Sequence, residues 1–198
     1  MGKKFSIFIL AACGIVLFSC NSDAEKKNDT SVAQTNRTTA ETQIPNEILQ
    51  LEKQVEQDSQ NVELRTTLAA SYYKAGVLDK AAFHFLKLYE KDNNNLIVLS
   101  NLGNIYYDAQ QDDKAIDFYE KALVLDPNNI DMRCDLATCY GRINRMKKAI
   151  QILKENIKMD ASHEKSHHNL AVWLKQNGNT EEAEAEMNIY TTLAAGKK

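Results

Sequence analysis

Three of the four histidines lie close together in the sequence, at His163, His167 and His168. His163 and His167 are four residues apart, a spacing that brings two imidazoles to one face of a helix. Such a pair could begin a metal site, but structural zinc needs four ligands and catalytic zinc needs at least three. No segment rich in carboxylates or cysteines is evident to supply the rest. We therefore expect no bound metal or other cofactor, and we interpret His167 as a packing residue.

Two cysteines, Cys134 and Cys139, lie five residues apart in a segment with helical periodicity. On a helix this spacing corresponds to about 7.5 Å of rise and about 140° of rotation. The two sulfur atoms cannot meet in a disulfide without breaking the helix. No positively charged partner is evident that would lower their pKa and make them reactive. We expect both to be buried, inert thiols.

No known catalytic motif occurs in the sequence. It lacks a nucleophile elbow, a Walker loop, a dinucleotide-binding glycine motif and a paired-histidine zinc motif with an intervening glutamate. We therefore expect a protein that is not an enzyme. The formal net charge is -3, and nothing suggests the concentrated basic surface that nucleic-acid binding requires. A nucleic-acid partner is not expected.

The first twenty residues differ from the rest of the chain. Lys3 and Lys4 precede an uncharged apolar run from Phe5 to Phe18, and Cys20 follows directly after Ser19. Such a run is too short to span ~30 Å of hydrocarbon comfortably, whereas its flanks are typical of a secretory signal. The segment resembles a bacterial lipoprotein signal peptide. This resemblance implies removal of residues 1–19, lipidation of Cys20 with palmitate-type chains, and attachment to a membrane of the cell envelope.

Two alternatives to lipidation at Cys20 remain open. The segment Leu10-Ala11-Ala12-Cys13 matches the local cleavage pattern better, and the apolar run could also serve as an uncleaved anchor. Cys20 is favoured because polar residues follow it at once. Residues 20–44 would then form the lipidated cysteine and a polar tether, because this stretch has too few large apolar residues to order itself.

Four columns of residues recur along the chain at a spacing of 34 residues. Their members are Leu68, Leu102, Leu136 and Leu170; Ala69, Gly103, Ala137 and Ala171; Tyr72, Tyr106, Tyr140 and Leu174; and Ala81, Ala115, Ala149 and Ala183. A period of this length is typical of stacked helix-turn-helix units. Such units bury their apolar residues against neighbouring units. The sequence therefore predicts an all-α solenoid.

Residues 96–129 resemble the tetratricopeptide repeat family most clearly. The matching residues are Leu99, Leu102, Gly103, Tyr106, Ala115, Tyr119, Ala122 and Pro127. The resemblance extends over further repeats at 62–95, 130–163 and 164–197. A column of aspartates, at Asp58, Asp92, Asp126 and Asp160, adds an N-terminal capping half-repeat at 45–61. The resemblance implies an all-α tetratricopeptide-repeat solenoid of about four and a half helix-turn-helix repeats.

Helix ends are predicted at the same period. Three asparagines suit N-caps of the first helix in a repeat: Asn61, Asn95 and Asn129. The end of that helix calls for a left-handed residue. Gly76 and Gly178 fit this position, Asn144 is an acceptable substitute, and Gln110 is a poor fit.

The family resemblance also implies a binding surface. Members of the family commonly hold a protein segment in a concave groove lined by the first helix of each repeat. Carried over to this sequence, the expected groove residues are Tyr73, Lys74, Ser100, Asn104, Tyr107, Thr138, Arg142, Lys165, His168 and Lys175. Asn104 matches an asparagine favoured for binding a peptide backbone, and tyrosines are common interface residues. Charge along the groove is more positive toward the C-terminal repeats, which suggests that an acidic part of the partner lies there.

We expect a non-catalytic scaffold or adaptor that is anchored to the bacterial envelope and binds a protein or peptide partner. The outer membrane is the expected membrane, with either a periplasmic or a surface-facing orientation. The alternative is a self-associating structural or assembly lipoprotein that forms a homodimer through its C-terminal helix edge. That edge carries Ile189, Tyr190 and Leu193.

Overall fold

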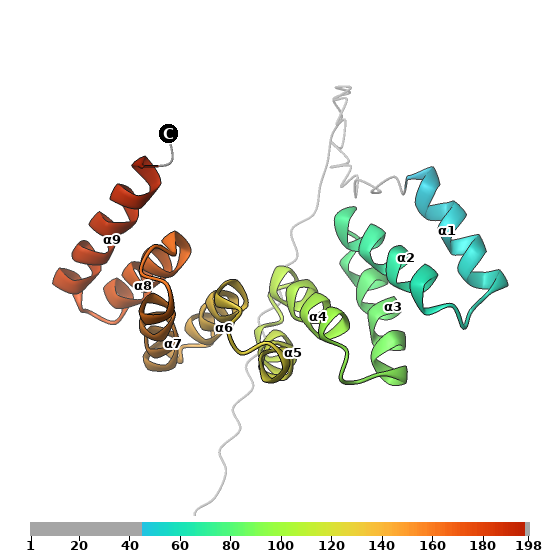
Figure 1. Ribbon diagram of the computed structural model, residues 1–198, viewed down its shortest axis with the longest axis horizontal. Helices are drawn as coiled ribbons and strands as arrows, with labels where there is room; N and C mark the ends of the chain where they lie inside the picture. Colours follow the sequence, from blue (N-terminus) through green and yellow to red (C-terminus); the bar gives the residue numbers. More distant parts are fainter. Residues whose placement is uncertain (1–44, 197–198) are drawn as a thin grey trace, which may run out of the picture. The chain divides into compact units, whose positions relative to one another are not determined.

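The computed structural model describes residues 45–196, which form nine α-helices and no strand (Figure 1). The helices are α1 (Asn46–Gln57), α2 (Val62–Lys74), α3 (Leu78–Lys91), α4 (Leu96–Asp108), α5 (Asp112–Leu125), α6 (Ile130–Arg142), α7 (Met146–Met159), α8 (Glu164–Gln176) and α9 (Thr180–Ala195). The all-α fold predicted from the 34-residue period is confirmed. The expected signal peptide, the tether, Cys20 and the alternative Cys13 lie outside the described residues. No helix in residues 45–196 is long and apolar enough to cross a bilayer.

The helices stack in chain order. Each one packs against the helix before it and the helix after it, and α6 also contacts α4 and α8. Each even-numbered helix pairs with the odd-numbered helix that follows it (Figure 1). Because contacts join only near neighbours along the chain, the core is continuous through the stack rather than gathered at one centre.

Small residues set the distance between neighbouring helices. The four alanines of the Ala81 column are all buried. A Cβ atom added at Gly103 would lie 2.5 Å from the ring of Tyr119, and one added at Gly141 would lie 2.4 Å from the ring of Trp173. Such distances are well inside van der Waals contact, so only glycine permits these two rings to pack where they do.

The helix caps follow the predicted columns. The side-chain oxygens of Asn61, Asn95 and Asn129 accept hydrogen bonds from backbone N–H groups in the first turns of α2, α4 and α6, as expected. Left-handed residues end all four even-numbered helices: Gly76 (φ 75°), Gln110 (φ 55°), Asn144 (φ 65°) and Gly178 (φ 86°). The backbone N–H of the residue after each of these bonds back five residues, as in a Schellman motif. Gln110 therefore adopts the conformation for which its residue type is poorly suited.

A polar contact joins successive repeats. The Tyr72 hydroxyl donates to Glu52 on α1, and Lys80 Nζ donates to both of these side chains at 3.0 Å. The same three residue types recur 68 positions later as Tyr140, Glu120 and Lys148.

At the other two junctions between successive repeats, different residues occupy the same three positions of the 34-residue period. In the intervening junction Leu86 replaces the glutamate, and Lys114 Nζ lies 5.0 Å from the centre of the Tyr106 ring. In the last junction the charges are reversed, because Lys154 pairs with Glu182 at 2.6 Å. Exposed pairs of this kind contribute little to stability, but they distinguish one junction from another.

Titratable side chains pair within the first and last repeats. Arg65 donates to the Nδ1 atom of His84 at 3.3 Å. In the last repeat, His167 lies 2.6 Å from Glu186 through Nδ1 and 3.0 Å from the Ala161 carbonyl through Nε2. The corresponding columns of the second repeat hold only apolar side chains, Leu99 and Phe118. The two outer repeats thus depend on polar pairing where the second repeat relies on apolar packing.

The substitution Gln110→Gly is expected to stabilise the protein. It relieves a left-handed strain of about 1–2 kcal/mol and adds flexibility to the unfolded chain that costs about 0.5–1 kcal/mol. The free energy of unfolding in urea should therefore rise by roughly 0.5–1 kcal/mol. The matched control is Ala109→Gly, because Ala109 has an ordinary φ of -74° and its replacement by glycine should lower stability. Equal effects of the two substitutions would contradict this assignment of strain.

Stability is expected to fall in acid through His84. Burial, and then the nearby charge of Arg65, lower the pKa of His84, so the folded state favours the neutral ring. Its contribution to stability is present above the unfolded-state pKa of about 6.5 and is lost as the pH falls through the lower folded-state pKa. The substitution His84→Gln keeps an acceptor for Arg65 but does not titrate. Urea unfolding between about pH 8 and about pH 5 should show a smaller loss of stability for this variant than for the wild type. Identical pH profiles would exclude the role of His84.

Candidate functional site

The predicted partner-binding residues lie on the even-numbered helices. The first helix of each repeat, here α2, α4, α6 or α8, is its helix A. We call the surface that these residues form, together with Ile97, the A-helix face. Its residues are Tyr73 and Lys74 on α2; Ile97, Ser100, Asn104 and Tyr107 on α4; Thr138 and Arg142 on α6; and Lys165, His168 and Lys175 on α8. Ile97 is 60% exposed although it is a large apolar side chain.

Side chains of the A-helix face connect one repeat to the next. The Tyr73 hydroxyl donates to Asp108 Oδ2 at 2.6 Å, which joins α2 to α4. Arg142 on α6 donates to the Tyr107 carbonyl oxygen at 3.2 Å, and its guanidinium lies 4.3 Å from the centre of the Tyr107 ring. Burial, followed by the bond to Asp108, raises the pKa of Tyr73. Both tyrosines are therefore held in fixed positions, and Tyr73 is kept as a neutral hydroxyl.

Two further contacts join α6 to α8. Lys165 Nζ pairs with Asp135 at 2.8 Å, and the Asn169 amide donates to the Thr138 hydroxyl at 3.2 Å. Burial is the main reason that the pKa of Asp135 is raised.

Asp135 and Asn169 were not among the residues predicted from the sequence. They belong to a polar column with 34-residue spacing, formed by Thr67, Asn101, Asp135 and Asn169. This recurrence of polar residues is the feature of the sequence that could have identified Asp135 and Asn169.

The positive charges of the C-terminal half are largely neutralised within the protein. Arg142 lies 2.6 Å from Asp112 on α5, and Lys165 is paired with Asp135. Asp112 and Asp135 are not among the predicted groove residues, and they balance the charges of Arg142 and Lys165. The expectation that an acidic part of the partner lies over the C-terminal repeats therefore loses its basis. Lys74 and Lys175 are exposed and lie far apart in the sequence, on α2 and α8.

Polar groups on α4 are oriented by internal hydrogen bonds. The Tyr119 hydroxyl of α5 donates to Asn104 Oδ1 at 2.8 Å. The Asn101 amide donates to the Ile97 carbonyl oxygen at 2.7 Å, and the Ser100 hydroxyl donates to the same oxygen at 3.1 Å. Each asparagine therefore uses one end of its amide internally and leaves the other end for an external partner.

The three clustered histidines point to separate partners. His163 lies 2.8 Å from the Ser166 hydroxyl and 3.3 Å from Asp131, whereas His167 contacts Glu186. The His168 ring packs 5.0 Å from the ring of Tyr190. Within residues 45–196, no group of three or more histidine, cysteine, aspartate or glutamate side chains is arranged to hold a metal. His167 is buried between α8 and α9, as the packing interpretation predicted.

Both cysteines of the described chain are free and buried, as expected. The Cys134 sulfur lies 3.2 Å from the Ser166 hydroxyl and 3.5 Å from the Asn156 amide nitrogen. Burial raises the pKa of Cys134, and it raises the pKa of Cys139 to about 12. Thiols with a raised pKa and no solvent access are poor nucleophiles.

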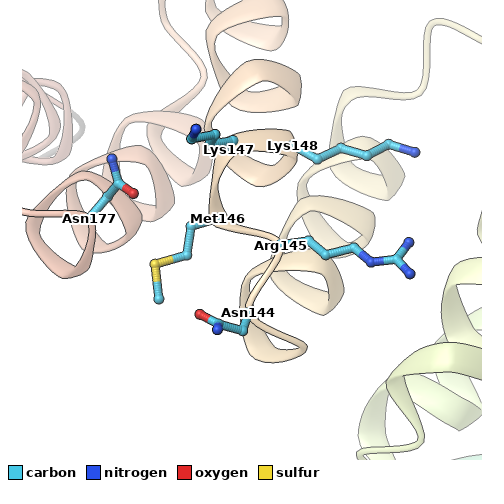
Figure 2. Close-up of a pocket in the computed structure, with 6 residues that line it drawn as sticks. All are labelled: Asn144, Arg145, Met146, Lys147, Lys148 and Asn177. Atoms are coloured by element: carbon cyan, nitrogen blue, oxygen red, sulfur yellow. The ribbon is translucent and has the colours of Figure 1, made fainter.

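A pocket of about 410 Å³ lies where the turn between α6 and α7 meets the end of α8 (Figure 2). Its lining residues are Asn144, Arg145, Met146, Lys147, Lys148 and Asn177. A pocket of about 350 Å³ lies one repeat earlier, and its six lining residues are those 34 positions before the six of the first pocket: Gln110, Gln111, Asp112, Asp113, Lys114 and Ile143. Figure 2 shows Arg145 and Lys148 extending away from Asn177, so the cationic groups do not converge on one point. We therefore attribute both pockets to the stacking of successive turns.

The C-terminal edge combines apolar and acidic groups. A pocket of about 340 Å³ between α8 and α9 is lined by Ala171, Val172, Lys175, Thr180, Ala183, Glu184 and Met187. Ile189 is 42% exposed, whereas Tyr190 and Leu193 are half-buried. Glu181 and Glu182 are also exposed on α9.

Comparisons with known proteins agree with this architecture. Residues 97–129 match the family model of the tetratricopeptide repeat. A structure of MamA designated MSR-1 C2 has a TM-score of 0.70 and 24% identity, and the match covers 76% of this chain and 87% of that chain. Another crystal structure of MamA has a TM-score of 0.70 and 20% identity, with 76% and 88% covered. A double mutant designated MamA RS-1 ArsTM has a TM-score of 0.72 and 14% identity, with 76% and 85% covered. No curated protein matches in sequence.

The matched segment coincides with α4, α5 and the turns around them, and the same helix-turn-helix arrangement recurs on both sides of it. The similarity to the MamA structures extends over three quarters of the chain and concerns the fold. The family match identifies residues 97–129 as a tetratricopeptide repeat, and the repeat spacing and the helix stacking extend the same solenoid fold over residues 45–196.

Proposed function

We propose that the protein is a non-catalytic scaffold that binds a protein segment on the A-helix face. The observation that carries this proposal is the state of the side chains on that face. Ile97 is exposed, Tyr73 and Tyr107 are held by neighbouring repeats, and Asn104 has one amide end unused. Rigid aromatic groups beside oriented polar groups are typical of protein interfaces.

The outer surfaces of the odd-numbered helices offer a weaker case. Some of their polar side chains pair within one helix, as in Lys121 with Asp117 and Lys87 with Glu90. Large apolar side chains such as Phe83 and Val124 are exposed there on separate helices. Single exposed apolar residues are normal on protein surfaces.

We also propose that the scaffold is attached to a bacterial membrane through lipid on Cys20. This part of the proposal rests on the sequence of residues 1–20 alone. Because residues 21–44 are polar, they would allow the repeats to reach a partner at some distance from the lipid. The scaffold would then hold its partner close to the envelope.

Photo-crosslinking in cells tests the binding surface. A photoreactive residue at Lys74 or at Ile97 places the probe on the A-helix face, and both should yield the same crosslinked partner. The controls are Asp117 and Gln151, which occupy one column on the exposed surfaces of α5 and α7. Mass spectrometry of the adducts identifies the partner. Adducts that form equally well from the control positions would contradict the proposal for this face.

Labelling with an alkyne analogue of palmitate tests the anchor. The full chain expressed in a bacterium should incorporate the label and sediment with membranes. Cys20→Ser should lose both properties, because the acylated thiol is absent, whereas Cys13→Ser should retain them. Loss of label only in the Cys13 variant would move the lipid to that residue. If the wild-type chain incorporated no label, lipidation would be excluded.

A further inference from the structure

The imidazole of His167 joins the last two helices of the described array. Its Nδ1 atom lies 2.6 Å from Glu186 Oε2 on α9, and its Nε2 atom lies 3.0 Å from the Ala161 carbonyl oxygen. The side chain of His167 is 3% exposed, so both bonds are shielded from water. A carbonyl oxygen and a carboxylate only accept hydrogen bonds, and each ring nitrogen must therefore carry a proton. Because imidazole is a stronger base than a carboxylate, these protons lie on the ring, which makes His167 an imidazolium ion.

The first repeat makes the same two bonds from the same positions of the 34-residue period. Arg65, three periods before His167, donates to the Ser59 carbonyl oxygen at 2.9 Å and to His84 Nδ1 at 3.3 Å. These two acceptors lie three periods before the acceptors around His167. A guanidinium group keeps its charge and can only donate. The first repeat thus holds a permanent cation at this position, whereas the last repeat holds one that a rise in pH can remove.

The elements packed against α8 place two carboxylates near His167. Glu186 on α9 faces the ring directly. Asp160, the residue after α7, lies close enough for the charge of His167 to act on it. Hydrogen bonds from Ser162 are the main reason that the pKa of Asp160 is lowered, and the charges of His163 and His167 add to the effect.

Other charged side chains at the contacts among α6, α7, α8 and α9 have partners of their own. Those partners are Glu155 for Arg133, Glu182 for Lys154, Asp131 for His163 and Asp135 for Lys165. Glu186 is therefore the carboxylate that directly balances the charge of His167.

The terminal helix α9 buries few apolar side chains. It packs mainly on α8, and Ala183 is the buried residue that it contributes. The equivalent helix of the first repeat, α3, buries Ala81, Phe85 and Leu88. The ends of a repeat array can open while its middle stays folded. The two bonds of His167 therefore make up a large share of what holds α9 in place.

We propose that the His167–Glu186 pair is a pH-sensitive contact that holds α9 on α8 while His167 is protonated and releases α9 when the ring loses its proton. A neutral ring carries one N–H group, so it can no longer donate both to Glu186 and to the Ala161 carbonyl. One of the two acceptors then loses its bond, which favours separation of the helices. This contact belongs to the terminal repeat and does not depend on the proposed function.

The pH dependence through His167 is opposite in sign to that through His84. The folded state keeps a proton that the unfolded chain releases above the ordinary histidine pKa of about 6.5. The contribution of the pair is complete below that pH, down to the ordinary glutamate pKa of about 4.3, and it is lost as the pH rises. Acid therefore weakens the first repeat through His84, whereas base weakens the last repeat through His167.

Nitrogen NMR of the full chain labelled with ¹⁵N-histidine measures the charge of the ring directly. At about pH 7.5, roughly one unit above the ordinary histidine pKa, both ring nitrogens of His167 should show the chemical shifts of an imidazolium ion. The spectrum of His167→Gln assigns the signals. A ring with one unprotonated nitrogen at this pH would overturn the proposal.

Hydrogen exchange detected by mass spectrometry measures the release of α9. Between about pH 6.5 and about pH 8.5, opening of α9 relative to α4 should increase by about tenfold in the wild type, as expected for loss of a hydrogen bond to a charged group. His167→Arg places the permanent cation of the first repeat at the same position and should keep α9 protected at the higher pH. His168→Gln is the matched control, because it removes the neighbouring histidine and should leave the pH response unchanged.

The substitution Glu186→Gln gives an independent result. The amide of glutamine can donate to the Nδ1 atom of a neutral ring, while Nε2–H still donates to the Ala161 carbonyl. Opening of α9 in this variant should therefore be the same at both pH values, and this expectation holds even if arginine is too large for position 167. An equal increase in opening in the wild type and in Glu186→Gln would contradict the proposal, as would a wild-type α9 that stays closed at the higher pH.

Discussion

Close approach between helices is the constraint on which the other features of this protein depend. A single helix pair cannot bury its apolar side chains, so each pair must pack tightly against the next. Alanine and glycine columns make this possible, and the clash distances at Gly103 and Gly141 show how little space remains. The links between repeats on the A-helix face, such as Tyr73 to Asp108, span the same short distance between helices. Tight stacking therefore determines which side chains can meet on the surface.

Tight stacking also brings polar groups into partly buried surroundings. Asp135 is bonded to Lys165 on the neighbouring helix, and burial still raises the pKa of its carboxyl group. Breaking such a pair leaves a poorly solvated charge, which costs more than the pair contributes. Side chains of this kind keep adjacent repeats in one relative position. A surface held in this manner loses little conformational entropy when it binds a partner.

The fold could be predicted from the sequence because one period governs it. Columns of leucine, alanine and tyrosine predict the helices and their stacking, and Asn61, like the other capping asparagines, predicts where a helix begins. The details of the surface could not be predicted in the same way. The pairing of Lys165 with Asp135 joins residues 30 positions apart on different helices, and it depends on side-chain directions that a spacing does not reveal. Gln110 shows the same limit, because its neighbours impose a left-handed backbone despite its residue type.

The polar contacts between repeats limit how the modules of this array can be rearranged. If the second repeat were excised, Leu86 would face Tyr140 and Lys148, which reproduces the arrangement of Leu86 with Tyr106 and Lys114. If the third repeat were excised, Glu120 would face Glu182, and two like charges would meet at the new junction. Repeats of similar fold are therefore not equivalent parts. Removal of the second repeat would thus keep an existing arrangement of side chains, whereas removal of the third would create one that occurs at none of the described junctions.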